Sequence, residues 1–195
     1  MSIDTDYAVL RSVLTGKPVE GVRTPNVAPD PHGGWAVEFG VYSGYSLSLI
    51  AAHMPVIGFD SFKGLPEDWR EGFPKGSFAI PEDGPSVQDI LLMGPQRMVV
   101  AGWFEDTVPT FPFPHLSLVH VDCDLYSSTV EVLRAVTPHV GPGTIFVFDE
   151  FDNYPGWEEH EAKAWSEWCV RHNANVSLIA EHDQEKAFVL DWWGS

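Results

Sequence analysis

The sequence is poor in basic residues, in cysteine and in long apolar runs. Only 11 Lys and Arg residues stand against 28 Asp and Glu residues, which gives a formal net charge of −17. No stretch combines clustered basic side chains with aromatic ones, so nucleic acids and anionic membrane surfaces are not expected as partners. The two cysteines, Cys123 and Cys169, form neither a disulfide framework nor a CxxC pair, which fits a reducing compartment.

Signals for export and membrane insertion are also missing. The N-terminal segment contains aspartates and has no basic region ahead of an apolar core, so it lacks the pattern of a secretory signal. No apolar run approaches the ~20 residues that cross a bilayer. Because 44% of the 195 residues are hydrophobic, the chain can bury one sizeable core. We therefore expect a soluble, cytoplasmic protein with one domain over residues 1–195.

Short apolar strands alternate with helical patterns along the chain. The predicted strands are Ala36–Phe39, Val56–Phe59, Met98–Val100, Leu116–Val121 and Thr144–Phe148. The predicted helices are Ser46–His53, Ser86–Met93, Ser128–Val136 and Trp157–Asn173. Two last strands, Val176–Ala180 and Lys186–Leu190, are close enough to form an antiparallel hairpin. This order predicts an α/β, Rossmann-like, doubly wound and mostly parallel seven-stranded sheet with an antiparallel C-terminal hairpin strand.

The connection Ser61–Pro85 has no helical or strand period although it is long. Connections of this length without secondary structure are uncommon in compact domains and are usually functional or disordered. This one carries Phe62, Trp69, Phe73 and Phe78. We interpret residues 61–85 as an ordered lid loop rather than a disordered linker.

A glycine-rich turn follows the first predicted strand and leads directly into a helix. It runs from Gly40 through Tyr42 and Gly44 to Ser46. In a doubly wound sheet the ligand binds beyond the carboxyl ends of the strands, and glycines let the backbone approach it closely. The spacing is GxxxG and not the GxGxxG of a dinucleotide-binding turn. The alternative is that these glycines serve only a sharp turn.

Acidic residues lie at the ends of the first two predicted strands. Glu38 is embedded in an apolar strand, and a buried charge without a partner is costly. Its partner is either the amino group of an amino-acid-like ligand or a backbone N–H or lysine of the protein. Asp60 ends the second strand, where an acid typically accepts hydrogen bonds from ribose hydroxyls. The alternative for Asp60 is a turn or helix-capping role.

Carboxylates also follow the fourth and fifth predicted strands. Asp122 and Asp124 come after one strand, and Asp149 and Glu150 come after the other. If these strands are parallel neighbours, Asp122, Asp149 and Glu150 converge, and their repulsion raises their pKa values unless a cation joins them. Mg²⁺ is the expected cation because it takes oxygen ligands. The alternative is that these are solvated residues that cap the following helices.

Five ordered blocks of the sequence resemble the macrocin O-methyltransferase (TylF/MycF) family. They are VEFGVYSGYS (Val37–Ser46), GFDSFKGLPEDW (Gly58–Trp69), AGWFEDTVP (Ala101–Pro109), VDCDLYSST (Val121–Thr129) and GPGTIFVFDEF (Gly141–Phe151). The glycine-rich block is also similar to that of catechol O-methyltransferase. Together the blocks are far more specific than any one glycine turn.

The resemblance implies a class I methyltransferase that transfers a methyl group from S-adenosylmethionine to a hydroxyl oxygen with the help of Mg²⁺. The implied cofactor-binding residues are Glu38, Gly40, Tyr42, Gly44, Ser46, Asp60, Ser61 and Trp103. The implied metal ligands are Asp122, Asp149 and Glu150, although relatives more often have Asp or Asn at the position of Glu150. Asp124 matches the position proposed as general base in sugar methyltransferases of the family.

Two other functions remain open at this point: an NAD-dependent oxidoreductase and a non-catalytic cofactor-binding protein on the same fold. The missing GxGxxG disfavours the first, and the intact strand-end carboxylates disfavour the second. The acceptor, whether a sugar, a glycosylated natural product or a phenol, is left undetermined, as is a homo-oligomer. Residues 1–34 form an N-terminal cover segment that the resemblance implies is shorter than in sugar-modifying relatives.

Overall fold

A computed structural model describes residues 7–26, 28, 30–80, 89–90 and 96–194. Its described strands form one seven-stranded sheet in the order β3-β2-β1-β4-β5-β7-β6. Strand β7 is antiparallel to both of its neighbours, and the other pairings are parallel. The strands are β1 (Trp35–Phe39), β2 (Val56–Asp60), β3 (Arg97–Ala101), β4 (Leu116–Val121), β5 (Ile145–Phe148), β6 (Ala174–His182) and β7 (Glu185–Trp193). The predicted doubly wound, mostly parallel sheet is confirmed.

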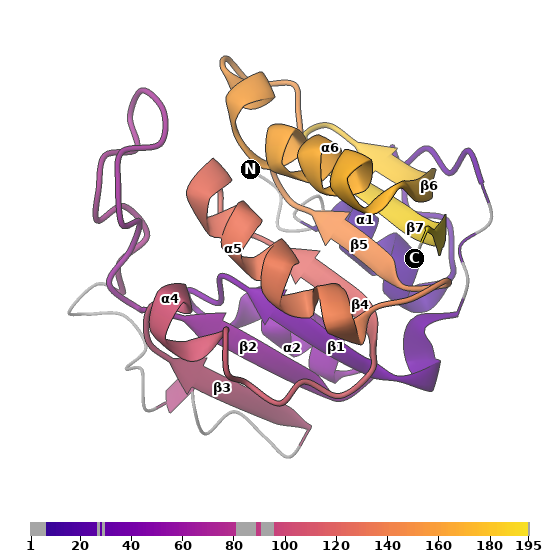
Figure 1. The fold of residues 1–195 in the computed structure, drawn as a ribbon, viewed down its shortest axis with the longest axis horizontal. Coiled ribbons are helices and arrows are strands. Elements are labelled where there is room, and N and C mark those ends of the chain that lie inside the picture. The colour runs from indigo at the N-terminus through magenta and orange to yellow at the C-terminus, as the bar shows by residue number, and fades with distance from the viewer. Residues whose placement is uncertain (1–6, 27, 29, 81–88, 91–95, 195) are drawn as a thin grey trace.

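Helices cover both faces of this sheet (Figure 1). The α-helices are α1 (Ala8–Thr15), α2 (Tyr45–Ala51), α4 (Phe104–Thr107), α5 (Tyr126–Val136) and α6 (Glu161–His172), and the 3₁₀ helices are Pro31–Gly33, Thr137–His139 and Trp157–Glu159. Helices α4, α5 and α6 lie on one face, and α1 and α2 lie on the other. No helix in the described ranges is both long and apolar enough to span a membrane.

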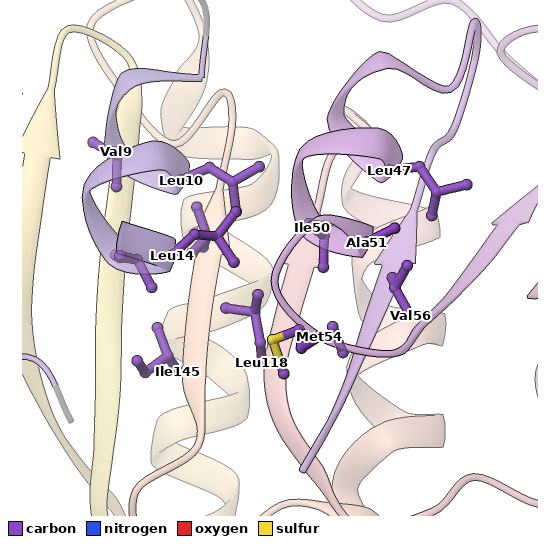
Figure 2. Close-up of a cluster of buried hydrophobic side chains, with 14 of the residues drawn as sticks. Val9, Leu10, Leu14, Leu47, Ile50, Ala51, Met54, Val56, Leu118 and Ile145 are labelled. Carbon is purple, nitrogen blue, oxygen red and sulfur yellow. The ribbon is translucent and has the colours of Figure 1, made fainter. Parts of the chain in front are cut away.

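The alternation of side chains along the strands divides the core into two layers. In β1 and β5, Ala36 and Ile145 belong to the layer under α1 and α2, whereas Val37 and Phe146 belong to the layer under α5 and α6. Figure 2 shows the first layer, in which side chains of α1 and α2 converge on the sheet residues Leu118 and Ile145. Near-continuous apolar strands are therefore explained by burial on both faces.

Several element boundaries differ from the prediction. The expected helix Trp157–Asn173 is broken at His160, where φ is −115° and ψ is −128°, so a short 3₁₀ helix precedes α6. The hairpin strands β6 and β7 extend beyond the predicted ranges, because the connecting turn is shorter than the polar stretch EHDQE. Most of the predicted helix Ser86–Met93 and the end of the predicted lid, residues 81–85, lie outside the described residues.

The chain reverses its direction of winding between β1 and β4. It proceeds from β1 outward to β2 and β3, and then returns to the other side of β1 to form β4. Residues Phe39, Val121 and Phe148 occupy one level at the carboxyl ends of β1, β4 and β5. The residues that follow these three positions are therefore neighbours, at the point where doubly wound sheets bind their ligands.

Candidate active site

Three carboxylates meet where β4 and β5 end. Asp122 follows β4, Asp149 and Glu150 follow β5, and one oxygen of each lies within 4.8 Å of the others. Burial raises the pKa of Asp122 to about 6. Burial and then the neighbouring carboxylates raise the pKa values of Asp149 and Glu150 well above their usual range. The prediction that these three side chains converge is confirmed by this geometry.

Asp124 lies beside this cluster, in the loop that follows β4. Its side chain is buried, and its backbone has a φ of +64°, in the left-handed region that non-glycine residues rarely adopt. Burial, followed by the negative charge of Asp122, raises the pKa of Asp124 to about 7, while hydrogen bonding with Glu150 and the guanidinium of Arg70 act in the opposite direction. Its backbone N–H donates a hydrogen bond of 3.2 Å to Oε1 of Glu161.

The glycine-rich turn is shaped by the close approach of β1 and β4. Gly40 has a φ of +95°, and a Cβ atom at this position would lie 1.8 Å from the carbonyl oxygen of Asp122. No other residue fits without moving one of the two strand ends. Gly44, with a φ of +81°, caps the start of α2. The first glycine thus serves the junction of the two strands, and the second begins the helix.

Asp60 connects the glycine turn to the start of the predicted lid. Its Oδ2 accepts hydrogen bonds from the backbone N–H groups of Val41 (2.7 Å) and Tyr42 (2.8 Å). Its Oδ1 accepts one from the N–H of Phe62 at 2.6 Å. These bonds assign Asp60 the turn-stabilising role that the sequence analysis gave as an alternative. A carboxylate has further lone pairs, so these bonds are compatible with a ligand contact.

Glu38 is fully buried, and its partner is a histidine. Oε1 of Glu38 lies 2.9 Å from Nδ1 of His120 on the adjacent β4, and Ser46 also hydrogen-bonds to Glu38. Burial raises the pKa of Glu38, and the bonds from His120 and Ser46 oppose this shift. The partner within the protein is therefore a histidine and not the backbone N–H or lysine that the sequence analysis gave as the alternative to a ligand. Within the described structure, Oε2 of Glu38 and Nε2 of His120 have no hydrogen-bond partner.

A cavity of about 240 Å³ opens between these elements. Nine of the predicted site residues line it: Gly40, Tyr42, Asp60, Ser61, Trp103, Asp122, Asp124, Asp149 and Glu150. Glu38, Gly44 and Ser46 are not part of the lining; Glu38 and Ser46 are buried beneath it. The structure therefore brings the glycine turn, the end of β2 and both carboxylate-bearing strand ends around one space.

Several lining residues were not among the site residues predicted from the sequence. The hydroxyl of Tyr7, just before α1, donates a hydrogen bond of 3.3 Å to Oδ2 of Asp122. The others are Gly64, Leu65, Pro66, Phe78, Phe104, Cys123 and Ser128. The apolar spacing of Val9, Leu10, Val13 and Leu14 is a signal from which α1 could have been predicted. Nothing in the sequence near Tyr7 indicates that it reaches Asp122.

The part of the predicted lid that the structure describes, residues 61–80, is folded back on itself. The backbone N–H of Leu65 donates to the carbonyl of Ser77 at 2.8 Å, and an antiparallel bridge joins Lys63 to Ala79. The guanidinium of Arg70 lies 3.9 Å from the centre of the Trp69 ring and 4.4 Å from that of Tyr154. These contacts support the interpretation as an ordered segment.

Comparison with known proteins assigns the family. The family model for macrocin O-methyltransferase (TylF) matches residues 24–180, which is most of the chain. The chain belongs to the macrocin O-methyltransferase family. This confirms the resemblance seen in the five sequence blocks, and it places the carboxylate cluster and the glycine turn within the matched region.

Two curated relatives illustrate the similarity. A tetracenomycin 4'-O-methyltransferase from Streptomyces olivaceus, whose name includes a rhamnosyl compound, is 29% identical over 135 residues, covering 59% of this chain and 52% of its own. The demethyldecarbamoylnovobiocin O-methyltransferase of Streptomyces niveus is 29% identical over 153 residues, covering 68% of this chain and 56% of its own. The chain thus spans about half the length of these relatives.

Solved structures extend the likeness to three dimensions. A crystal structure of a calicheamicin methyltransferase matches with a TM-score of 0.63 at 28% identity, covering 80% of this chain and 72% of that one. The chain therefore shares its overall fold with this methyltransferase.

Proposed function

We propose that the chain is an S-adenosylmethionine-dependent O-methyltransferase that uses Mg²⁺ and acts on a hydroxyl group of a small molecule. The observation that carries this proposal is the group of carboxylates, Asp122, Asp124, Asp149 and Glu150, that faces the same cavity as the glycine turn. Family membership favours methyl transfer over the NAD-dependent oxidoreductase considered from the sequence.

The methyl donor would occupy the side of the cavity formed by the glycine turn and the end of β2. We assign Gly40, Tyr42, Asp60, Ser61 and Trp103 to contacts with the donor because they line this side. Asp60 would accept hydrogen bonds from the ribose hydroxyls with its remaining lone pairs. Gly44 and the buried Glu38 and Ser46 would support the glycine turn or bind the methionine part of the donor.

The residues at the carboxyl ends of β4 and β5 fit a divalent cation. Asp122, Asp149 and Glu150 each offer an oxygen within the 4.8 Å cluster. Burial and then the neighbouring carboxylates raise the pKa values of Asp149 and Glu150, and a bound cation would oppose this shift. Oxygen donors of this kind suit Mg²⁺. Bound there, the ion would lower the pKa of a coordinated hydroxyl and hold its oxygen in place.

The reaction then requires alignment and the removal of one proton. In methyl transfer the acceptor oxygen would form a bond to the methyl carbon of the donor, and the bond between that carbon and sulfur would break. Asp124, beside the cluster and on the cavity wall, would take the proton of the hydroxyl. The folded lid segment supplies Leu65, Pro66 and Phe78 to the wall, and these side chains keep water away from the reacting groups.

The acceptor is proposed by class only. One relative is named for a rhamnosyl compound, and another for a novobiocin precursor. We infer that the acceptor of this chain is a sugar, a glycosylated natural product or a phenol. The net charge of the protein, −17, agrees with a neutral or cationic small molecule as acceptor and not with nucleic acid.

The test is a binding experiment followed by an activity assay. S-adenosylhomocysteine should raise the melting temperature of the folded protein, NADH should not, and EDTA should abolish methyl transfer to an acceptor found by screening sugars, glycosides and phenols. Absence of S-adenosylhomocysteine binding by calorimetry, with and without Mg²⁺, would remove the proposal. Binding without turnover on any acceptor would support a non-catalytic protein instead.

A further inference from the structure

Glu161 is a buried carboxylate next to the proposed base. It is the first residue of α6 and has no exposed surface. Its Oε1 accepts the hydrogen bond from the backbone N–H of Asp124, and its Oε2 has no hydrogen-bond partner within the described structure. The charged groups that act on it most strongly are the carboxylates of Asp124, Asp122 and Asp149. Glu161 therefore lies in surroundings that are unfavourable for a negative charge.

Stability does not explain a carboxyl group at this position. Burying a carboxyl group without a cation is costly, and an apolar side chain of similar volume is usually at least as stable in such a place. The break at His160 makes Glu161 the first residue of α6. This start brings Glu161 to the loop between β4 and α5, where its Oε1 accepts the hydrogen bond from the backbone N–H of Asp124.

Asp124 needs support from its surroundings because its backbone is strained. Its φ of +64° is unfavourable for a residue with a side chain, and such conformations persist only where neighbouring groups hold them. The adjacent turn is tight, since the N–H of Leu125 donates to the carbonyl of Cys123 at 2.6 Å. The bond to Glu161 satisfies the one backbone donor of Asp124 and fixes the plane of its peptide.

We propose that Glu161 is a positioning residue that anchors the backbone amide of Asp124 and thereby sets where the Asp124 carboxylate stands on the cavity wall. This inference rests on the proposed function, in which Asp124 takes a proton from the acceptor. Glu161 does not line the cavity, so it acts through Asp124 and not on the acceptor itself.

Two substitutions separate anchoring from packing. Glu161→Leu removes the acceptor atom and keeps the volume, so kcat should fall by about 10- to 100-fold, the scale of a misplaced catalytic group. The Km for the acceptor and the affinity for S-adenosylhomocysteine should change by less than about threefold, because the anchored residue is not a binding contact. Glu161→Gln keeps an amide oxygen that accepts the same bond and should restore most of the lost rate.

A double-mutant cycle tests whether the effect passes through Asp124. In an Asp124→Asn background, Glu161→Leu should cost little further rate, since the carboxylate that it positions is already gone. Unchanged kcat in Glu161→Leu would overturn the proposal. The proposal would also be overturned if Glu161→Leu lowers kcat by the same factor in the natural and the Asp124→Asn backgrounds. The same holds if the fall in kcat is accompanied by an equal loss of affinity for S-adenosylhomocysteine.

A measurement that needs no activity tests the anchor separately from the proposed function. Hydrogen exchange of the Asp124 amide should be at least about tenfold faster in Glu161→Leu than in the natural chain or in Glu161→Gln. The amide of Thr129, which donates to the carbonyl of Leu125 at 2.9 Å, is the internal control and should not change. Equal exchange of the Asp124 amide in all three proteins would overturn the anchor even if methyl transfer is demonstrated.

Discussion

At the scale of single residues, the carboxylates around the cavity fall into two groups with different expected roles. Asp149→Asn removes a charged oxygen from the proposed metal site, so the Mg²⁺ concentration that gives half the maximal rate should rise by at least about tenfold. Asp124→Asn removes the proposed base and should lower kcat by about 10² to 10⁴ without changing that concentration. Steady-state rates measured over a Mg²⁺ titration distinguish the two.

The matched control for these substitutions is Asp191→Asn. Asp191 is exposed on β7 and accepts a hydrogen bond from Ser177, so the variant removes the same charge away from the cavity. This variant should leave kcat and the Mg²⁺ concentration that gives half the maximal rate unchanged. If chelation of Mg²⁺ does not alter the rate on the true acceptor, or if Asp149→Asn and Asp124→Asn have the same phenotype, the proposed division of roles is wrong.

Much of the cavity wall could be predicted because it follows from strand ends. Residues such as Gly40, Asp122 and Asp149 come directly after apolar strands, and parallel strands bring their ends together. The contacts between side chains distant in sequence could not be predicted in this way. His120 and Glu38 are 82 residues apart, Asp122 and Tyr7 are 115 apart, and both pairings depend on the completed fold.

At the scale of elements, the strands were predicted more accurately than the helices. Leu116–Val121 was predicted with its observed bounds, because a strand buried on both faces is a near-continuous apolar run, here interrupted only by Ser117 and His120. The helices α1 and α4 were missed. Helix α4 has only four residues, too few to show a periodic pattern, whereas the apolar spacing in α1 is a helical signal that the prediction did not use. The break at His160 was missed as well, since the tryptophans on both sides of it keep a helical spacing.

The lid segment 61–80 should be held closed by stacking of Arg70 between aromatic rings. Its guanidinium contacts the rings of Trp69 in the segment and Tyr154 after β5. Arg70→Met keeps the aliphatic part and removes the cation, which should cost about 1–2 kcal/mol of local stability. The amides of Leu65 and Gly76, which are hydrogen-bonded within the segment, should exchange about 5- to 30-fold faster.

Hydrogen exchange followed by mass spectrometry measures this effect without any ligand. Arg134→Met, at an exposed position of α5, is the matched control and should not alter exchange in the lid segment. S-adenosylhomocysteine together with an acceptor should slow the exchange of the same amides further, as expected for a segment that closes over the proposed reaction site. Equal exchange in the natural chain and Arg70→Met would contradict the stacking argument.

At the scale of the whole molecule, the antiparallel strand β7 connects the site to the N-terminal helix. Glu185, the first residue of β7, is buried, and its Oε2 accepts a hydrogen bond of 2.5 Å from the backbone N–H of Val9 at the start of α1. Because α1 follows Tyr7, this bond also helps to place the tyrosine that contacts Asp122. The stability of the fold and the shape of the cavity are thus linked through one buried acid.

This buried acid predicts a specific dependence of stability on pH. Burial raises the pKa of Glu185 from 4.5 to about 7, although the N–H of Val9 and the charges of His120 and His182 act in the opposite direction. The carboxylate of Asp149 also faces this group. Between pH 4.5 and 7 the folded chain therefore binds more protons at Glu185 than the unfolded chain does. This residue's contribution to the free energy of unfolding is full below pH 4.5 and is lost as the pH rises towards 7.

Glu185→Gln isolates this contribution, because glutamine does not titrate and its amide oxygen can still accept the bond from Val9. Relative to the natural chain, the variant should gain stability as the pH rises from 4.5 to 8, by at most about 3 kcal/mol. Urea denaturation at several pH values measures the difference. Glu71→Gln, which removes the same charge from an exposed position, reports the effect of net charge alone. A difference between Glu185→Gln and the natural chain that stays constant with pH, or that follows Glu71→Gln, would show that Glu185 has no raised pKa in the folded protein.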